Sequence, residues 1–238
     1  RASLLFDIRG FWADERVEGN LWNLKNPMYQ TLYKFFKKKE KYLFGKADGI
    51  VTLTKNAREY ILKNFRTKEV FEVIPCSVDI EHFSKSSLDN SKQLSLREQL
   101  KINNDAYVLG YIGSLGTRYR LKDMLLFYKE LKKQEDKAIL LFVTKTPSDF
   151  IYSQLKSLDI SQSKVRIISS DYNHMPNYID IMNASMFFVT VGFSGKAVSP
   201  TKQSEVLSMG KPIVANAGLG DTDIILKENN LGVLVSSF

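Results

Sequence analysis

Residues 199–212 read Ser-Pro-Thr-Lys-Gln-Ser-Glu-Val-Leu-Ser-Met-Gly-Lys-Pro. An apolar strand pattern, residues 186–189, precedes this stretch, and another, residues 213–215, follows it. Between them, Pro200-Thr201 is typical of a helix start and Gly210 of a helix end. The stretch therefore predicts a strand, a loop, a helix and a second strand, which is the repeating unit of an α/β sheet.

The predicted helix begins directly after a loop, and free backbone N–H groups at such a helix start favour a bound phosphate. Lys202 and Glu205 lie three residues apart and share one helix face. Together they predict a ligand with both phosphate and hydroxyl groups, such as a phosphorylated sugar or a nucleotide. An ordinary surface helix with an ion pair between these two side chains is the equally simple alternative.

The composition is that of a globular protein: 238 residues, 44% of them hydrophobic, with a net charge of +8. A single cysteine and two distant histidines favour neither an internal disulfide nor a zinc site, and we expect no metal and no other cofactor. No apolar run approaches the length of a membrane span. The positive charge favours anionic partners, but no aromatic and basic platform predicts nucleic-acid binding.

Both ends of the chain fall within or directly beside strand patterns, and the first residue is Arg1 rather than Met. We therefore expect this sequence to be an internal piece of a longer protein.

Strands and helices alternate regularly from residue 107 onward. The strand patterns are residues 107–112, 138–143, 165–168, 186–189, 213–215 and 232–235, and the helical patterns are residues 121–132, 148–158, 175–182, 201–209 and 221–227. Apolar strands alternating with amphipathic helices predict a parallel sheet covered on both faces. We expect a complete, doubly wound Rossmann-like domain over residues 81–238.

The first 80 residues contain only three strand patterns, at residues 4–8, 49–53 and 70–74, and predict the second half of another Rossmann-like domain. Residues 11–26 are expected to form a loop. Asp7 and Arg9 lie at the exit of the first strand, which is the ligand-binding edge of such sheets. An exposed loop of mixed charge is the alternative.

A long helix is predicted from Pro27, with apolar residues on one face. The other face carries the lysines Lys34, Lys37, Lys38, Lys39 and Lys41. Such a helix either lies on an anionic membrane or packs with its lysines solvated.

In a doubly wound sheet, the loops after the first and fourth strands face one crevice. Here these loops predict a diphosphate cradle that continues into the helix start, with backbone, hydroxyl and cationic groups from Gly113, Ser114, Thr117, Arg118, Arg120, Gly195, Lys196, Ser199, Pro200 and Thr201. Tyr172, after the third strand, is positioned to stack on a nucleobase.

Four segments together resemble the retaining family 4 glycosyltransferases of the GT-B fold. Residues 73–79 with Phe83 resemble the linker between the two domains of that family, and residues 110–115 resemble the first strand of its C-terminal domain. Residues 199–214 resemble its donor-binding helix, and residues 232–235 its last strand.

The resemblance implies transfer of a sugar, with retention and without metal, from a nucleotide-diphosphate donor to a polysaccharide or lipid-linked acceptor. It implies a role in surface polysaccharide synthesis, such as lipopolysaccharide or capsule, in the cytoplasm or at the inner face of the membrane. Glu205 matches the family's second motif glutamate, which contacts the donor ribose. Ala197 stands in place of the first, so Lys202 is expected to carry more of the diphosphate contact. Ser114 stands in place of the usual arginine, which leaves Arg118, Arg120 or Lys122 to supply that charge.

Two other functions fit the same architecture: a sugar-nucleotide epimerase, and a non-catalytic module that binds nucleotide sugars. Under the glycosyltransferase hypothesis the acceptor side, with Asp7 and Arg9, belongs to an incomplete domain. We therefore expect the chain by itself to be nearly inactive.

Overall fold

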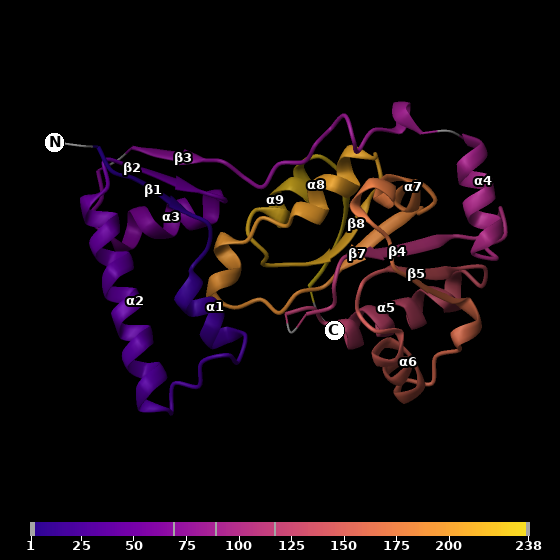
Figure 1. The fold of residues 1–238 in the computed structure, drawn as a ribbon, viewed down its shortest axis with the longest axis horizontal. Helices are drawn as coiled ribbons and strands as arrows, with labels where there is room; N and C mark the ends of the chain where they lie inside the picture. The colour runs from indigo at the N-terminus through magenta and orange to yellow at the C-terminus, as the bar shows by residue number, and fades with distance from the viewer. Residues whose placement is uncertain (1–2, 69, 89, 117, 237–238) are drawn as a thin grey trace. The chain divides into compact units, whose positions relative to one another are not determined.

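A computed structural model of the chain describes residues 3–68, 70–88, 90–116 and 118–236. These residues form two compact units (Figure 1). The first unit contains the chain up to Cys76 together with Thr190–Pro200 and Gly218–Ile224; the second contains Ser77–Val189, Thr201–Ala217 and the chain from Ile225. The units therefore do not follow a single cut at residue 80, because two later segments pack with the first unit.

The first unit is built on three parallel strands in the order β1 (Leu5–Ile8), β2 (Gly49–Thr52) and β3 (Phe71–Val73). Its helices are α1 (Trp12–Glu18), α2 (Pro27–Lys46), α3 (Lys55–Asn64) and the short 3-10 helix η4 (Phe193–Ala197). Phe11, Phe44, Ile50, Ile61 and Ala197 meet in one apolar core. This shared core explains why residues 190–200 group with the first unit.

Helix α1 corrects the prediction of a loop over residues 11–26. Phe11, the residue before this helix, is fully buried, and Ala13 and Asp14 are buried within it. The seven-residue helix lacks a side-chain cap, so packing on one face rather than a local signal stabilises it.

The second unit confirms the predicted α/β class, with six parallel strands in the order β6-β5-β4-β7-β8-β9. These strands are β4 (Val108–Ile112), β5 (Ile139–Val143), β6 (Val165–Ile168), β7 (Ala184–Phe187), β8 (Ile213–Asn216) and β9 (Gly232–Val235). In order of appearance this is 3-2-1-4-5-6, the doubly wound order, with the reversal between β4 and β7. The loops that follow β4 and β7 therefore start side by side.

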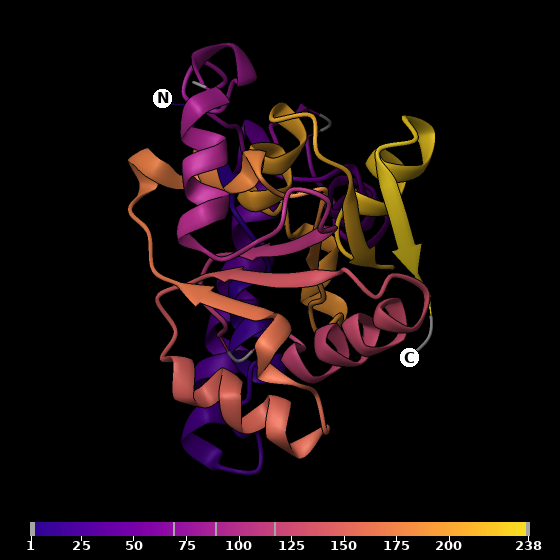
Figure 2. The ribbon, with the colours of Figure 1, turned by 90° about the vertical axis from the view of Figure 1, so that its right-hand side faces the viewer.

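Helices cover both faces of this sheet. The helices are α4 (Asn90–Gln99), α5 (Leu121–Gln134), α6 (Ser148–Ser157), α7 (Met175–Asp180), α8 (Thr201–Ser208) and α9 (Thr222–Glu228), with 3-10 turns η1 (Lys85–Ser87), η2 (Gln162–Lys164) and η3 (Tyr172–His174). Figure 2 shows α5 and α6 on one face and α4 on the other. Both faces of the central strands β4, β5 and β7 are thus buried, which explains why β4 and β5 are almost entirely apolar.

Strand β7 ends at Phe187, two residues earlier than the sequence pattern predicts. The backbone of Phe188 accepts a hydrogen bond from Arg120 N. The buried Asn216 side chain then takes over the pairing of Val189: Asn216 Oδ1 accepts from Val189 N at 2.7 Å, and Asn216 Nδ2 donates to Val189 O at 3.0 Å. An amide side chain therefore holds the chain where the strand stops.

Replacing Asn216 by alanine is expected to lower the free energy of unfolding by about 2–3 kcal/mol, because two buried backbone groups of Val189 lose their partners. Urea unfolding measures this loss. Asn104→Ala, at an exposed position, is the matched control and should change stability by less than about 0.5 kcal/mol. Equal stability of the two variants would show that Asn216 does not support this segment.

Candidate functional site

Lys202 lies on the first turn of α8, and its ammonium group is packed against two aromatic rings. Lys202 Nζ lies 4.5 Å from the ring centroid of Tyr111 and 3.9 Å from that of Tyr119. It also donates a hydrogen bond of 3.3 Å to the hydroxyl of Tyr111, which in turn donates to the carbonyl of Ser114 at 3.0 Å. The helix start and the loop after β4 are thereby joined through one cation.

Gly113 leaves the space that Lys202 occupies. A Cβ atom at this position would lie 3.2 Å from Lys202 Nζ, and the backbone has a φ of +101°, which side chains disfavour. The glycine that ends β4 therefore allows the ammonium group to approach the backbone closely.

Burial lowers the pKa of Lys202 to about 7, because the charged form loses hydration that the nearby Glu205 carboxylate only partly replaces. Burial likewise raises the pKa of Glu205, against the opposing charges of Lys202 and His82. Among the described residues the two side chains form no ion pair, so the alternative of an ordinary surface ion pair is not what the structure shows. Lys202, with a pKa close to neutral pH, is therefore poised to change charge when a ligand arrives.

A pair of stacked rings lies near Glu205. The rings of His82 and Tyr172 are 4.7 Å apart at an angle of 18°, and His82 Nε2 donates to the carbonyl oxygen of Tyr172 at 3.1 Å. Phe83, fully buried, meets the edge of Tyr172 at 5.5 Å. Tyr172 is still 54% exposed and keeps an open surface for a flat ring. The sequence pointed to Tyr172 but missed His82, whose position just before Phe83 of the linker was the available signal.

The loop after β4 contributes less free charge than predicted. Ser114 and Gly116 are exposed, but Arg120 forms an ion pair of 2.5 Å with Asp123 at the start of α5. Burial raises the pKa of Tyr119, and the positive charge of the nearby Arg118 partly opposes this shift. Thr117, the remaining predicted residue of this loop, lies outside the described residues.

The predicted residues between 195 and 200 are placed in the first unit. The Lys196 carbonyl accepts a hydrogen bond of 2.5 Å from Thr54, and Ser199 Oγ accepts one of 3.1 Å from Cys76 N. Gly195 is buried and its carbonyl is bonded to Gly220 N, whereas the Lys196 side chain is exposed and Pro200 partly buried. The structure thus joins Gly113, Lys202, Glu205 and Tyr172 within the second unit, and the preceding loop is bound within the first.

Two further residues explain how this loop is held. Ala197 is only 2% exposed and belongs to the apolar core of the first unit. The buried Ser194 N–H donates to both carboxylate oxygens of Glu18, at 3.1 and 3.2 Å, from the end of α1. A glutamate in place of Ala197 would have to bury its charge in that core.

Asp7 and Arg9 line a pocket of about 250 Å³ in the first unit, between α1 and α2. Their side chains are exposed and lie 3.9 Å apart. The walls also carry the aromatic rings of Trp12 and Phe36. This pocket combines flat apolar surfaces with charged groups at the exit of β1.

Lys37 is not on the exposed basic face of α2, which corrects its predicted place. Its ammonium group donates to Asp14 at 2.7 Å and also to Glu40, while Tyr33 donates to Asp14 at 2.7 Å. Burial disfavours the charged form of Lys37, but the hydrogen bonds to Asp14 and Glu40 outweigh it and raise its pKa. Lys37 therefore turns inward because two carboxylates hold it, and Lys34, Lys38, Lys39 and Lys41 remain exposed.

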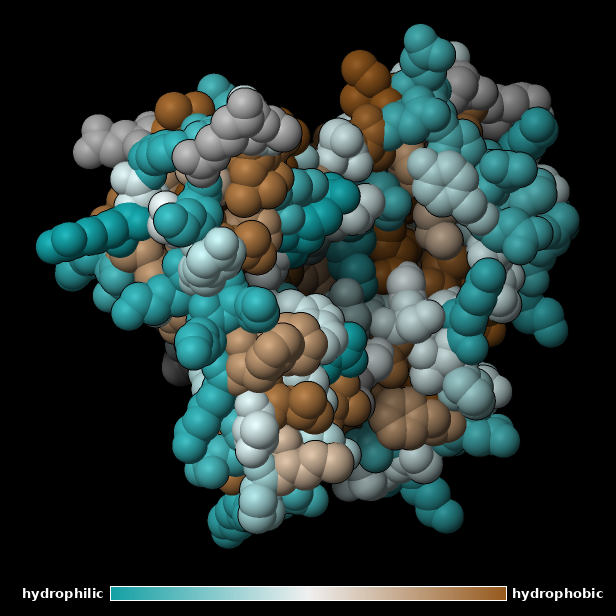
Figure 3. Space-filling view, turned by 60° about the vertical axis from the view of Figure 1, so that its left-hand side comes forward, coloured by the Kyte–Doolittle hydropathy of each residue, from teal (hydrophilic) through white to brown (hydrophobic). Residues whose placement is uncertain are grey.

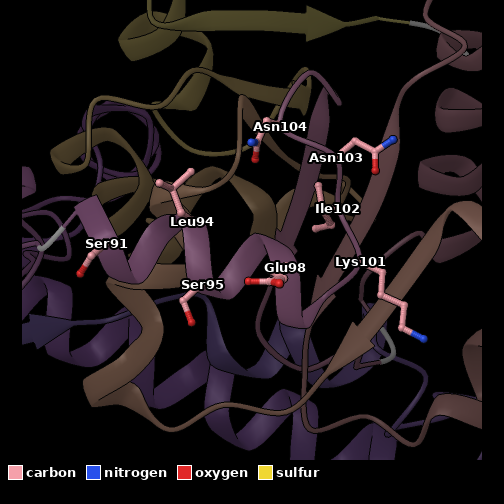
Figure 4. Close-up of a pocket in the computed structure, with 8 residues that line it drawn as sticks. All are labelled: Ser91, Leu94, Ser95, Glu98, Lys101, Ile102, Asn103 and Asn104. Atoms are coloured by element: carbon pink, nitrogen blue, oxygen red, sulfur yellow. The ribbon is translucent and has the colours of Figure 1, made fainter.

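A second groove lies on the surface of the second unit, along α4. A groove of about 800 Å³ follows α4 and the loop after it, where Leu94, Ser95 and Glu98 lie on one helix (Figure 4). Within the described residues no three His, Cys, Asp or Glu side chains gather as metal ligands, and no helix has both the length and the apolar character to cross a bilayer.

No protein-family model matches the chain. An uncharacterized glycosyltransferase of Methanocaldococcus jannaschii, MJ1069, is 23% identical over 82% of this chain and 47% of its own length. The structure of WaaG, a glycosyltransferase involved in lipopolysaccharide biosynthesis, aligns over 97% of this chain and 60% of WaaG, with a TM-score of 0.72 and 16% identity. Anabaena HepE in complex with UDP-glucose aligns over 99% of this chain and 59% of HepE, with a TM-score of 0.69 and 15% identity.

The chain folds as part of a GT-B glycosyltransferase. This confirms the resemblance predicted from the sequence. The chain spans about half of the length of its curated relative and about three fifths of these GT-B structures. Within the GT-B fold, the six-stranded unit carries Lys202 and Glu205, and the three-stranded unit carries Asp7 and Arg9.

The pKa of Lys202 predicts a pH-dependent effect of its replacement by methionine. Below pH 7 the lysine is charged in both the folded and the unfolded chain, so the folded state bears the full cost of burying the charge. Between pH 7 and 10.5 only the unfolded chain holds the extra proton, and the stability of the wild type rises with pH. We compare the free energy of unfolding of Lys202→Met with that of the wild type at each pH. This difference should favour the variant by about 1–3 kcal/mol more at pH 6 than at pH 9.5.

Urea unfolding at these two pH values measures that gain, and Lys122→Met, at an exposed lysine of α5, is the matched control. A difference between Lys202→Met and the wild type that does not change with pH would contradict the assigned pKa.

Proposed function

We propose that the protein is a glycosyltransferase that transfers a sugar from a nucleotide-diphosphate donor, and that the second unit binds this donor. The observation that carries the proposal is the Lys202 ammonium group, held beside Gly113 at the start of α8 against two aromatic rings and a hydroxyl, with the Glu205 carboxylate nearby. The similarity to MJ1069 and to HepE, whose structure contains UDP-glucose, supports a UDP-sugar as the donor.

The chemistry would be electrostatic. As the glycosidic bond of the donor breaks, negative charge develops on the leaving diphosphate. Lys202, with a pKa of about 7, is about half protonated in the free protein, and a bound diphosphate would draw a proton onto it. The N–H groups at the start of α8 would stabilise the same charge. No metal is required for these contacts.

The remaining donor contacts follow from the placement of side chains around Lys202. Glu205, one turn further along α8, is positioned to accept hydrogen bonds from the ribose hydroxyls. The exposed face of Tyr172, backed by His82, offers a stacking surface for the base. Retention of configuration and transfer of a hexose remain proposals that the family resemblance supports.

For the acceptor, we propose a glycan or lipid-linked glycan at the pocket of Asp7 and Arg9. Trp12 and Phe36 provide flat apolar surfaces of the kind that sugar rings pack against, and the charged side chains can bind hydroxyls.

The exposed face of α2 suits an anionic membrane surface, where such acceptors reside. Phe35 and Tyr42 are 52% and 58% exposed among the four exposed lysines, and Lys39 lies over the ring of Phe35 at 5.7 Å. Figure 3, which turns the side of Figure 1 that holds α2 toward the viewer, shows apolar side chains exposed among hydrophilic ones. Exposed rings beside lysines are what membrane interfaces favour, and a purely solvated face does not require them. We propose peripheral contact at the cytoplasmic side.

An epimerase or a non-catalytic binding module would use the same donor pocket. The buried Ala197 in place of a motif glutamate is the observation that favours a binding module. Product analysis with the full-length protein separates the three functions, because only a glycosyltransferase needs an acceptor and only an epimerase converts the donor alone.

Lys202→Ala and Glu205→Ala are each expected to weaken binding of UDP-glucose at least about tenfold, since each removes a polar contact in a partly buried site. Isothermal titration with the full-length protein measures the loss. Lys156→Ala, at an exposed lysine of α6, is the matched control and should bind like the wild type. Unchanged affinity in both site variants would refute the donor site.

Replacing Lys34, Lys38, Lys39 and Lys41 by alanine should reduce recovery with anionic vesicles in a flotation assay at least about tenfold, since each lysine near the surface contributes about 1 kcal/mol. The control removes equal charge at the exposed residues Lys92, Lys122, Lys156 and Lys227. Phe35→Ser with Tyr42→Ser should weaken binding while keeping the charge. Equal recovery of both lysine variants would exclude α2 as the contact.

A further inference from the structure

Basic side chains line a pocket of about 160 Å³ at the amino ends of three neighbouring strands of the second unit. The lining includes Asn103, Asp105, Lys101, Lys137, Lys164 and Arg166. Asp105 precedes β4, Lys137 precedes β5 and Lys164 precedes β6. Gly113, beside Lys202, follows the carboxyl end of β4, so this pocket lies at the opposite edge of the same sheet.

Arg166 builds the wall of this pocket. Its guanidinium group donates to the carbonyls of Lys101 at 2.9 Å, Ser163 at 2.8 Å and Val165 at 3.1 Å, and also to that of Leu100. These bonds tie the loop after α4 to the start of β6. Most of the guanidinium N–H groups, which elsewhere often bind a carboxylate, therefore donate to backbone carbonyls of the protein itself.

The pocket has an excess of positive charge. Lys137 pairs with Asp105 at 2.6 Å, and the pKa of Asp105 is lowered by this hydrogen bond and by the charges of Lys137 and Lys164. Within the described part of the chain, the ammonium groups of Lys101 and Lys164 make neither a hydrogen bond nor an ion pair. Among the lining residues one carboxylate thus faces three lysines and an arginine, and Glu135 and Asp136 act on Lys137 from outside the lining. Positive charge remains in excess, and an anion would relieve the repulsion between the cations.

Lys101 is held in place by the backbone. It has a φ of +52° at the end of α4, and its N–H bonds to the carbonyl of Glu98. In Figure 4 its side chain extends away from Leu94 and Ser91 of the α4 groove.

We propose that this pocket binds a small phosphate anion, such as inorganic phosphate or pyrophosphate, at a site separate from the donor site. Lysine ammonium groups act as point charges that suit phosphate, and the amide of Asn103 adds a neutral donor. The five residues of β4 span roughly 16 Å, longer than the Debye length of about 8 Å in physiological salt, so the two sites bind independently.

Thermal unfolding with and without pyrophosphate, at constant ionic strength set by chloride, tests the proposal. At about ten times its dissociation constant, pyrophosphate should raise the Tm of the wild type by about 2–4 °C. The same rise is expected for Lys202→Ala, which removes the donor-site cation. Loss of the rise in Lys202→Ala would assign the binding to the donor site and overturn the proposal.

Lys164→Ala and Lys101→Asn should each weaken pyrophosphate binding at least about tenfold in isothermal titration. Asparagine is chosen at residue 101 because it tolerates the positive φ. Lys164→Arg should retain binding, and Lys227→Ala, which removes equal charge elsewhere on the second unit, should bind like the wild type. An equal loss in Lys227→Ala, or citrate binding as tightly as pyrophosphate, would contradict a built phosphate site.

Discussion

The ammonium group of Lys202, held against Tyr111 and Tyr119, is the contact on which the candidate donor site depends. It is partly removed from water and forms no ion pair among the described residues. The nearby Glu205 carboxylate and cation–π contact with two rings, worth about 2 kcal/mol when desolvated, offset only part of that cost. Tyr111 comes from the buried core of β4 and Tyr119 from the loop that follows. The Lys202 side chain therefore links α8 to that loop, and its burial there lowers its pKa.

This contact requires the strand order of the second unit. Because β4 and β7 are neighbours, the loop after β4 starts beside the end of β7, and Tyr119 of this loop pairs with Val189. Asn216 continues the pairing past the end of β7, and the Phe188 carbonyl bonds to Arg120 N at the start of α5. The sheet, and not the loops alone, thus fixes where the first turn of α8 lies relative to Gly113.

The sequence predicted those parts of the structure that local patterns determine. All nine strands follow from their apolar runs, and the doubly wound order follows from strand and helix alternation with right-handed crossovers. Helix α1 was missed because only the tertiary burial of Phe11 supports it. Side-chain direction was also beyond reach: Lys37 turns inward to Asp14 as well as to Glu40, whereas Lys202 packs on tyrosines and, among the described residues, forms no ion pair with Glu205. His82 meets Tyr172 across 90 positions, which no local pattern encodes.

The cations near the candidate donor site contribute little to the net charge of +8. Lys202 is half neutral near pH 7, Arg120 is paired with Asp123, and Lys37 is paired with two carboxylates. Among the described residues, lysines without such partners include Lys34, Lys38, Lys39 and Lys41 on the outer face of α2, and Lys101 and Lys164 at the amino edge of the six-stranded sheet. Long-range attraction of anions therefore acts at these surfaces. Under the proposed function, a donor at Lys202 would supply the charge that protonates the lysine. Its recognition would then depend on short-range contacts and on a proton taken up with the ligand, and would be less sensitive to salt than binding at either lysine surface.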